Sequence, residues 1–116
     1  MKTLLVIDDE AKARKSIKLI LTQAGYQVVT ASNAAAGLRQ LKKRKISLVI
    51  LDIMMPGMTV REFVKKEKAK ILFLTLVRLS SAEKKSLKKL PRIVDFLQKP
   101  VDASQLLAKI KKIVKP

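Results

Sequence analysis

Cysteine, histidine and tryptophan are all absent from this 116-residue chain. Without cysteine the chain can form neither a disulfide nor a thiolate metal site, and without histidine the common zinc sites and histidine-based catalysis are excluded. Aromatic residues make up only 3% of the chain, so stacking of nucleic-acid bases on aromatic rings is scarce. Any chemistry must therefore rest on carboxylates and lysines.

Acidic residues are also few, with nine Asp and Glu against 26 Lys and Arg and a formal net charge of +17. Four of the nine acids lie in two segments that we expect to form one site: Asp8, Asp9, Glu10 and Asp52. The remaining surface must be strongly basic, which favours polyanions, acidic partner surfaces or anionic lipid headgroups. The same balance also fits a lysine-rich, heat-adapted composition that serves solubility alone.

Long hydrophobic runs are missing too. The apolar start of the chain ends at Asp8, far short of the apolar region of a signal peptide, and no other segment approaches membrane-spanning length. We therefore expect a cytoplasmic protein without a membrane span. A hydrophobic content of 48% over 116 residues predicts one globular domain, residues 1–116, with a substantial core.

Short apolar segments alternate with amphipathic helical segments along the whole chain. The expected strands are residues 3–7, 26–31, 46–52, 71–75 and 94–97. The second of these carries polar residues, as an edge strand would, so it should lie outermost. The alternation predicts an α/β domain in which five helices cover both faces of a five-stranded parallel sheet.

Local signals mark the ends of the expected helices. Gly25 has the position of a helix C-terminus, residue 32 or 33 can cap a second helix, and Ser80 with Glu83 has the spacing of a capping box. Asp102 offers another N-cap to the last helix.

Inward-facing residues can also be read from helical spacing. In the second helix we expect them at Ala35, Leu38 and Leu41. A short third helix is expected over residues 59–68, with Val60, Phe63 and Val64 inward.

Asp52 is the most informative single residue. It ends the apolar run 46–51, and Pro56-Gly57 soon afterwards requires a loop. In open α/β sheets the functional crevice lies outside the carboxyl ends of the strands, so an Asp at this place is a candidate site residue. Taken alone, it could equally cap a helix or simply close the strand.

Polar residues end the other strands as well. Asp8 and Asp9 follow the first strand, Asp52 ends the third, Thr75 the fourth, and Lys99 follows the fifth. Three carboxylates converging on one edge repel one another unless a cation joins them, and Mg²⁺ is the natural choice for oxygen ligands. A carboxylate beside Mg²⁺ can attack a phosphoryl group while a lysine and a hydroxyl hold its oxygens, which predicts an aspartyl phosphate.

The sequence at these strand ends resembles that of response regulator receiver domains, the CheY-like phosphoacceptors of two-component signalling. The motifs that carry the resemblance are Asp8-Asp9-Glu10, Asp52-Ile53-Met54-Met55-Pro56-Gly57, Thr75 and Lys99-Pro100. The resemblance spans residues 1–116 and implies a flavodoxin-like (CheY-like) fold with strand order 2-1-3-4-5.

The resemblance also implies a role for each acid. Asp52 would accept a phosphoryl group from a sensor histidine kinase. Mg²⁺ would be bound directly by Asp9 and Asp52, by Asp8 through water, and by the backbone carbonyl of Met54.

Two further roles follow by the same resemblance. Thr75 and Lys99 would hold the phosphoryl oxygens, and Phe96 would take the place of the aromatic switch that turns inward with Thr75. A core position is the equally weighted alternative for Phe96.

The chain departs from the family pattern at several positions. Leu76 replaces the small residue that normally follows the switch Thr, and we expect its bulk to narrow access to the phosphoryl site. Residues 90–95 lack the usual glycine ahead of the fifth strand.

Two other functions compete with a phosphoacceptor. Haloacid-dehalogenase-like phosphatases share the nucleophilic Asp, Thr, Lys and Mg²⁺, but they need a second Asp two residues later, where this chain has Met54, and it has no room for a cap. A basic nucleic-acid-binding module is the other, and it would use lysines of the fourth and last helices. Scarce aromatics and the absence of a helix-turn-helix make it less favoured than a phosphoacceptor, but it is the stronger of the two competing functions.

The preferred interpretation is a receiver that acts by self-catalysed phosphoryl acceptance rather than by turnover of a substrate. Its output would run through the fourth helix, fifth strand and fifth helix to a downstream protein, and the charge favours a partner with an acidic surface. A monomer or a phosphorylation-dependent dimer would fit this interpretation.

Overall fold

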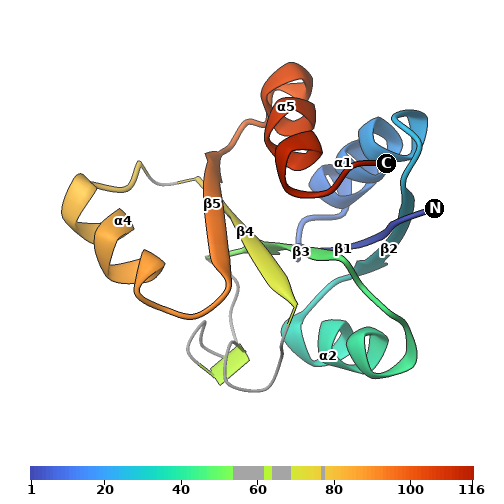
Figure 1. The fold of residues 1–116 in the computed structure, drawn as a ribbon, viewed down its shortest axis with the longest axis horizontal. Helices are drawn as coiled ribbons and strands as arrows, with labels where there is room; N and C mark the ends of the chain where they lie inside the picture. The colour runs from blue at the N-terminus through green and yellow to red at the C-terminus, as the bar shows by residue number, and fades with distance from the viewer. Residues whose placement is uncertain (54–61, 64–68, 77) are drawn as a thin grey trace.

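The computed structural model describes residues 1–53, 62–63, 69–76 and 78–116. Its elements are β1 (Thr3–Ile7), α1 (Ala11–Gln23), β2 (Gln27–Ala31), α2 (Ala34–Lys43), β3 (Leu48–Asp52), β4 (Lys70–Thr75), α4 (Ser81–Lys88), β5 (Ile93–Gln98) and α5 (Ala103–Ile113) (Figure 1). All five expected strands are present, with ends that differ from the prediction by at most two residues.

The strands form one parallel sheet in the order β2-β1-β3-β4-β5. This is the order that the family resemblance implied. Strand β3 is buried along its whole length, as its unbroken apolar sequence requires at the centre of a parallel sheet. Strand β2 is the outermost on its side and only its last residue is buried, which confirms the prediction of an edge strand.

Helices cover both faces of the sheet. Figure 1 shows α1 and α5 together on one face and α2 on the other. Because side chains alternate along a strand, β1 supplies Leu4 and Val6 to the hydrophobic cluster under α1 and α5, and Leu5 and Ile7 to the cluster on the opposite face. The sheet is thus buried from both sides, and its edges are the surfaces open to chemistry.

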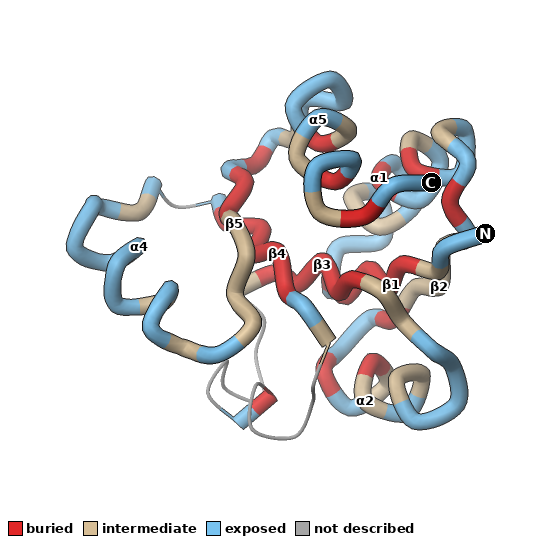
Figure 2. Tube along the Cα trace, viewed as in Figure 1, coloured by how far each residue is buried: buried red, intermediate tan, exposed pale blue. Residues whose placement is uncertain are grey.

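Helix α4 is packed differently from the other helices. It has no buried residue and lies beside the edge strand β5, away from the centre of the sheet (Figures 1 and 2). Partly buried Leu87 joins the second cluster from this helix. Such light packing leaves most of the surface of α4 exposed to solvent.

The predicted helix ends are confirmed. Gly25 follows α1 with a φ of +100°, a conformation that glycine adopts without steric penalty. Asn33 Oδ1 accepts a hydrogen bond from the Ala36 amide at 2.8 Å, and Ser80 and Glu83 exchange both hydrogen bonds of a capping box. Asp102 accepts from the Ser104 amide at the start of α5.

Of the three residues expected to face inward in α2, Leu38 and Leu41 do so, and Ala35 does not. Ala35 is exposed, whereas Ala34 and Gly37 are buried and Leu38 and Leu41 are partly buried. The reason is geometric, because the helix begins directly after its cap, Asn33, and its first residue already faces the sheet.

Other expectations concern the segments around β3 and β5. The third helix expected over 59–68 falls mostly outside the described residues, as do Val60 and Val64, but Phe63 is buried at 1% exposure. Ahead of β5, where a glycine is missing, Arg92 takes a positive φ of 68°. A residue other than glycine therefore adopts this conformation here, at some steric cost.

None of the described helices combines the length and apolar character that a bilayer crossing requires.

Tyr26 ties the end of α5 to the edge of the sheet, and it provides a first test of the fold. Its buried hydroxyl donates a hydrogen bond to the backbone carbonyl of Val114, and burial raises the pKa of Tyr26. Replacing Tyr26 with Phe keeps the ring but leaves that carbonyl without its donor, which should lower the free energy of unfolding by about 1–3 kcal/mol. Denaturant unfolding measures the change, and an unchanged stability would contradict the contact.

Candidate functional site

The carboxyl edge of the sheet gathers the polar residues that the sequence predicted there. Asp8 follows β1, Asp52 ends β3, Thr75 ends β4 and Lys99 follows β5. Backbone hydrogen bonds continue the ladder to this edge, from Lys99 N to Thr75 O at 2.7 Å and from Asp8 N to Ala31 O at 3.1 Å. The site residues are therefore held by the ends of rigid strands, which favours fixed positions.

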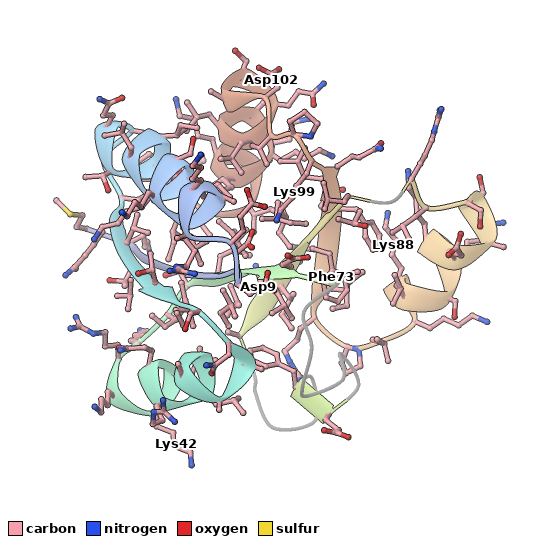
Figure 3. The ribbon with its side chains drawn as sticks, turned by 180° about the vertical axis from the view of Figure 1, so that it is seen from behind. Asp9, Lys42, Phe73, Lys88, Lys99 and Asp102 are labelled. Atoms are coloured by element: carbon pink, nitrogen blue, oxygen red, sulfur yellow. The ribbon has the colours of Figure 1, made fainter. Side chains whose placement is uncertain are left out.

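Lys99 joins two of the carboxylates. Its Nζ lies 2.6 Å from Asp8 Oδ2 and 3.2 Å from Asp52 Oδ2, and it donates a hydrogen bond to the latter. All three side chains are at most 8% exposed. Figure 3 labels Lys99 and Asp9, which follow the carboxyl ends of β5 and β1. The lysine thus neutralises part of the negative charge that the strand ends collect.

Asp8 is the most buried member, with no exposed surface. Its Oδ1 accepts a hydrogen bond from the Glu10 amide at 2.9 Å, which fixes the carboxylate at the entry to α1. Its Oδ2 has the close ion pair with Lys99 but no aligned hydrogen-bond donor among the described residues. The ion pair with Lys99 is therefore the contact that compensates the charge of this buried oxygen.

The protonation of Lys99 follows from two opposing effects. Burial lowers the pKa of Lys99, but the attraction of Asp8 and Asp52 outweighs the burial and raises the pKa above its usual value. The ammonium group stays charged at neutral pH. It can therefore act as a permanent positive charge toward an anion bound at this edge.

Three carboxylates are close enough to share a metal ion. Asp8, Asp9 and Asp52 each offer one oxygen, and these oxygens lie within 4.8 Å of one another. Asp9 is exposed whereas the other two are buried, so the cluster opens to solvent on one side. An all-oxygen set that leaves room for water suits Mg²⁺. Met54, whose backbone carbonyl was expected as a further ligand, lies outside the described residues.

Thr75 and Phe96 both lie on the β4–β5 side of the site. They are 3% and 8% exposed, and both line a pocket of about 240 Å³ together with Arg78 and Lys84. The Phe96 ring packs on Phe73 with centroids 5.8 Å apart.

The buried position of Phe96 agrees with the alternative of a core residue. It is also the inward position expected of a switch, so the structure alone leaves both interpretations open.

Leu76 lies just beyond Thr75, and 62% of it is exposed. It lines a pocket of about 350 Å³ with Glu10 and Lys99. The pocket adjoins the site, and narrowed access to the phosphoryl position stays a prediction.

Two contacts around the site were not foreseen from the sequence. Arg14 donates to the backbone carbonyl of Asp8 at 2.7 Å, and Lys88 of α4 places its Nζ 5.8 Å from the centre of the Phe96 ring. In Figure 3 Lys88 lies near Phe73, which stacks with that ring. The position of Arg14 near the start of α1, shortly after Asp8, could have indicated the first contact. The contact of Lys88 with Phe96 joins two different elements, and no local pattern in the sequence signals it.

The family of response regulator receiver domains matches residues 4–111 of the chain. The probable transcriptional regulator ycf27 of Pyropia yezoensis is 32% identical over 121 residues, covering 97% of this chain and 47% of the relative. The phosphate regulon regulatory protein PhoB of Pseudomonas aeruginosa is 29% identical, with coverages of 98% and 52%. The chain spans about half the length of these curated relatives.

Solved structures agree over the whole chain. The chemotaxis protein CheY4 of Vibrio cholerae superposes with a TM-score of 0.87 at 30% identity, covering 98% of this chain and 99% of the other. The response regulator TrrA of Thermotoga maritima, solved with Mg²⁺ and BeF, has a TM-score of 0.81 at 34% identity, with coverages of 98% and 100%. Because the family match extends over nearly all of the sequence and the fold agrees with it, the chain belongs to the response regulator receiver domains of two-component signalling.

Proposed function

We propose that Asp52 accepts a phosphoryl group from a sensor histidine kinase, with Mg²⁺ held by Asp8, Asp9 and Asp52. The observation that carries the proposal is the convergence of three carboxylate oxygens within 4.8 Å, with the ammonium of Lys99 3.2 Å from Asp52. Mg²⁺ and Lys99 would together neutralise an incoming phosphoryl group, as phosphoryl transfer requires.

The covalent step of this proposal is a transfer from the donor to Asp52. An oxygen of the Asp52 carboxylate forms a bond to phosphorus, while the bond from phosphorus to the donor breaks and its electron pair leaves with the donor. Thr75 and Lys99 hold the oxygens of the transferred group in this proposal. Their burial at the strand ends supports it, because buried donors keep their direction and exclude competing water.

Incubation with Mg²⁺ and acetyl phosphate tests the phosphoacceptor directly. Intact mass should show one added phosphoryl group that is lost in alkali, and it should be absent in the Asp52→Asn variant and after chelation of Mg²⁺. Asp102→Asn is the matched control, because it removes an exposed carboxylate at the cap of α5 and should be modified normally. A folded wild-type protein that takes up no phosphoryl group would contradict the proposal.

We further propose that phosphorylation acts on the surface of α4, β5 and α5 through Thr75 and Phe96. The pocket that these two residues share with Lys84 supports this connection, since it joins the site to the start of α4. The exposed, lysine-rich surface of α4 favours a downstream protein with an acidic face.

Receiver domains are regulatory modules, and we propose that this chain has no substrate turnover of its own. In this proposal residues 1–116 act as one receiver domain in the cytoplasm, as a monomer or a phosphorylation-dependent dimer. The phosphatase alternative lacks its acid, because Met rather than Asp occupies position 54.

A further inference from the structure

Several of the acids lie at one end of the strands, and a group of cations lies at the other end. The acids Asp8, Asp9, Glu10 and Asp52 lie at the carboxyl edge of the sheet, and Glu83 and Asp102 belong to helix starts that follow strands at that edge. The opposite edge, where the strands begin, has cations instead. We call it the basic edge, and define it by Lys2, Arg44, Lys45, Lys70 and Lys115.

The five residues of the basic edge come from distant parts of the chain but surround two adjoining hollows. One hollow of about 460 Å³ is lined by Lys2, Arg44 and Lys45. The other, of about 370 Å³, is lined by Lys2, Lys70 and Lys115. Lys2 and Ser47 line both, so the hollows form one continuous surface across the starts of β1, β3 and β4.

The cations of the basic edge are not neutralised within the described part of the chain. All five are exposed, and none takes part in an ion pair with a described carboxylate. By contrast, Lys99 and Lys109 pair with carboxylates elsewhere in the fold. Like charges held this close repel one another, so an anion bound across the hollows would be attracted by all of them.

The chemistry of the basic edge restricts the kind of polyanion. Met1 is the one exposed large apolar side chain among its described residues, which is too little for insertion into a membrane or for the apolar centre of a protein interface. The aromatic residue Tyr26, which directly precedes β2, is only 1% exposed. Its ring is therefore unavailable for stacking on unpaired bases. What remains is an array of donors suited to phosphate groups.

We propose that the basic edge binds the sugar–phosphate backbone of double-stranded DNA without sequence preference. The basic edge and the proposed phosphoacceptor Asp52 lie at opposite ends of the strands, so both sites can be used at once. This location differs from the helix lysines considered from the sequence, and it is independent of the proposed function. If all five cations contact phosphates, the logarithm of affinity should fall with the logarithm of salt concentration with a slope of about −4.5.

The test is a salt titration of binding to a fluorescent DNA duplex, in EDTA, with two matched triple variants. The edge variant carries Lys2→Gln, Lys45→Gln and Lys115→Gln, and its slope should fall to about −1.8 with at least a tenfold loss of affinity at low salt. The control variant removes the same charge from exposed positions of α4 and its C-terminus: Lys84→Gln, Lys85→Gln and Lys89→Gln. Its slope should equal that of the wild type.

Other probes decide whether the surface and the ligand are correctly assigned. Equal losses in the two variants would mean that overall charge drives binding, and would overturn the assignment to the basic edge. Absence of binding at low salt would also overturn it, as would tighter binding of duplex RNA, anionic vesicles or an acidic polypeptide. Thermal unfolding of each variant verifies that the fold is intact, and Asp52→Asn should bind DNA as the wild type does.

Discussion

Replacing Lys99 with Met should lower the free energy of unfolding by about 3–5 kcal/mol in the absence of divalent cations. The lysine is the cation that contacts both Asp8 and Asp52, and each of these carboxylates is buried. Methionine fills a similar volume but leaves two negative charges together in a poorly solvated place. Chemical denaturation at neutral pH measures the loss.

The matched control is Lys109→Met. Lys109 forms an ion pair with Asp95 at 2.9 Å, but both side chains are 34% exposed, so water screens the interaction. Its loss should lower stability by no more than about 1 kcal/mol. Similar effects of the two substitutions would contradict the argument that burial makes the Lys99 contacts important.

A second variant separates charge from packing. In Lys99→Met combined with Asp8→Asn, one of the two carboxylate charges that Lys99 contacts is removed while the shape of the site is kept. Most of the lost stability should return if repulsion between carboxylates is the cause. No recovery would mean that Lys99 stabilises the fold through the packing of its aliphatic chain instead.

The position of the site could be predicted from the sequence because of a property of parallel sheets. Strand ends of the same kind meet at one edge, so Asp8, Asp52, Thr75 and Lys99 could be placed together once the strands were recognised. The exposure of these side chains to solvent could not be predicted in the same way. Asp8 and Asp9 are neighbours with the same chemistry, yet one is fully buried and the other exposed, because the strand has ended and the chain bends at Asp9 before α1 begins at Ala11.

Other residues were misplaced or missed because the patterns in the sequence are local. In α2 the prediction of Leu38 and Leu41 is confirmed, but Ala35 was chosen where Ala34, the first residue after the cap Asn33, is the buried one. The contact of Lys88 with Phe96, and the meeting of Lys2, Lys70 and Lys115, join segments that are distant in sequence. Periodicity identifies the face of one element, but it does not report which other element supplies the neighbour.

Addition of Mg²⁺ should stabilise the folded protein, and this effect should depend on Asp9. Three carboxylates and one lysine leave a net charge of −2 at the site, which a divalent cation neutralises. At a concentration one hundred times its dissociation constant, bound Mg²⁺ should add about 2.7 kcal/mol to the free energy of unfolding. Thermal unfolding over a Mg²⁺ titration, with Na⁺ at matched ionic strength, measures the increase.

The Asp9→Asn variant should change stability in opposite directions with and without the metal. Without Mg²⁺ it should be as stable as the wild type or more so, by about 0.5–1 kcal/mol, because one repelling charge has been removed. With Mg²⁺ it should gain much less, since a ligand is lost. Asp102→Asn removes an equal charge but keeps its cap, because Asn and Asp cap helices equally well, and it should retain the full metal effect. If Asp9→Asn were stabilised by Mg²⁺ as strongly as Asp102→Asn, the metal would have to bind somewhere other than the carboxyl edge.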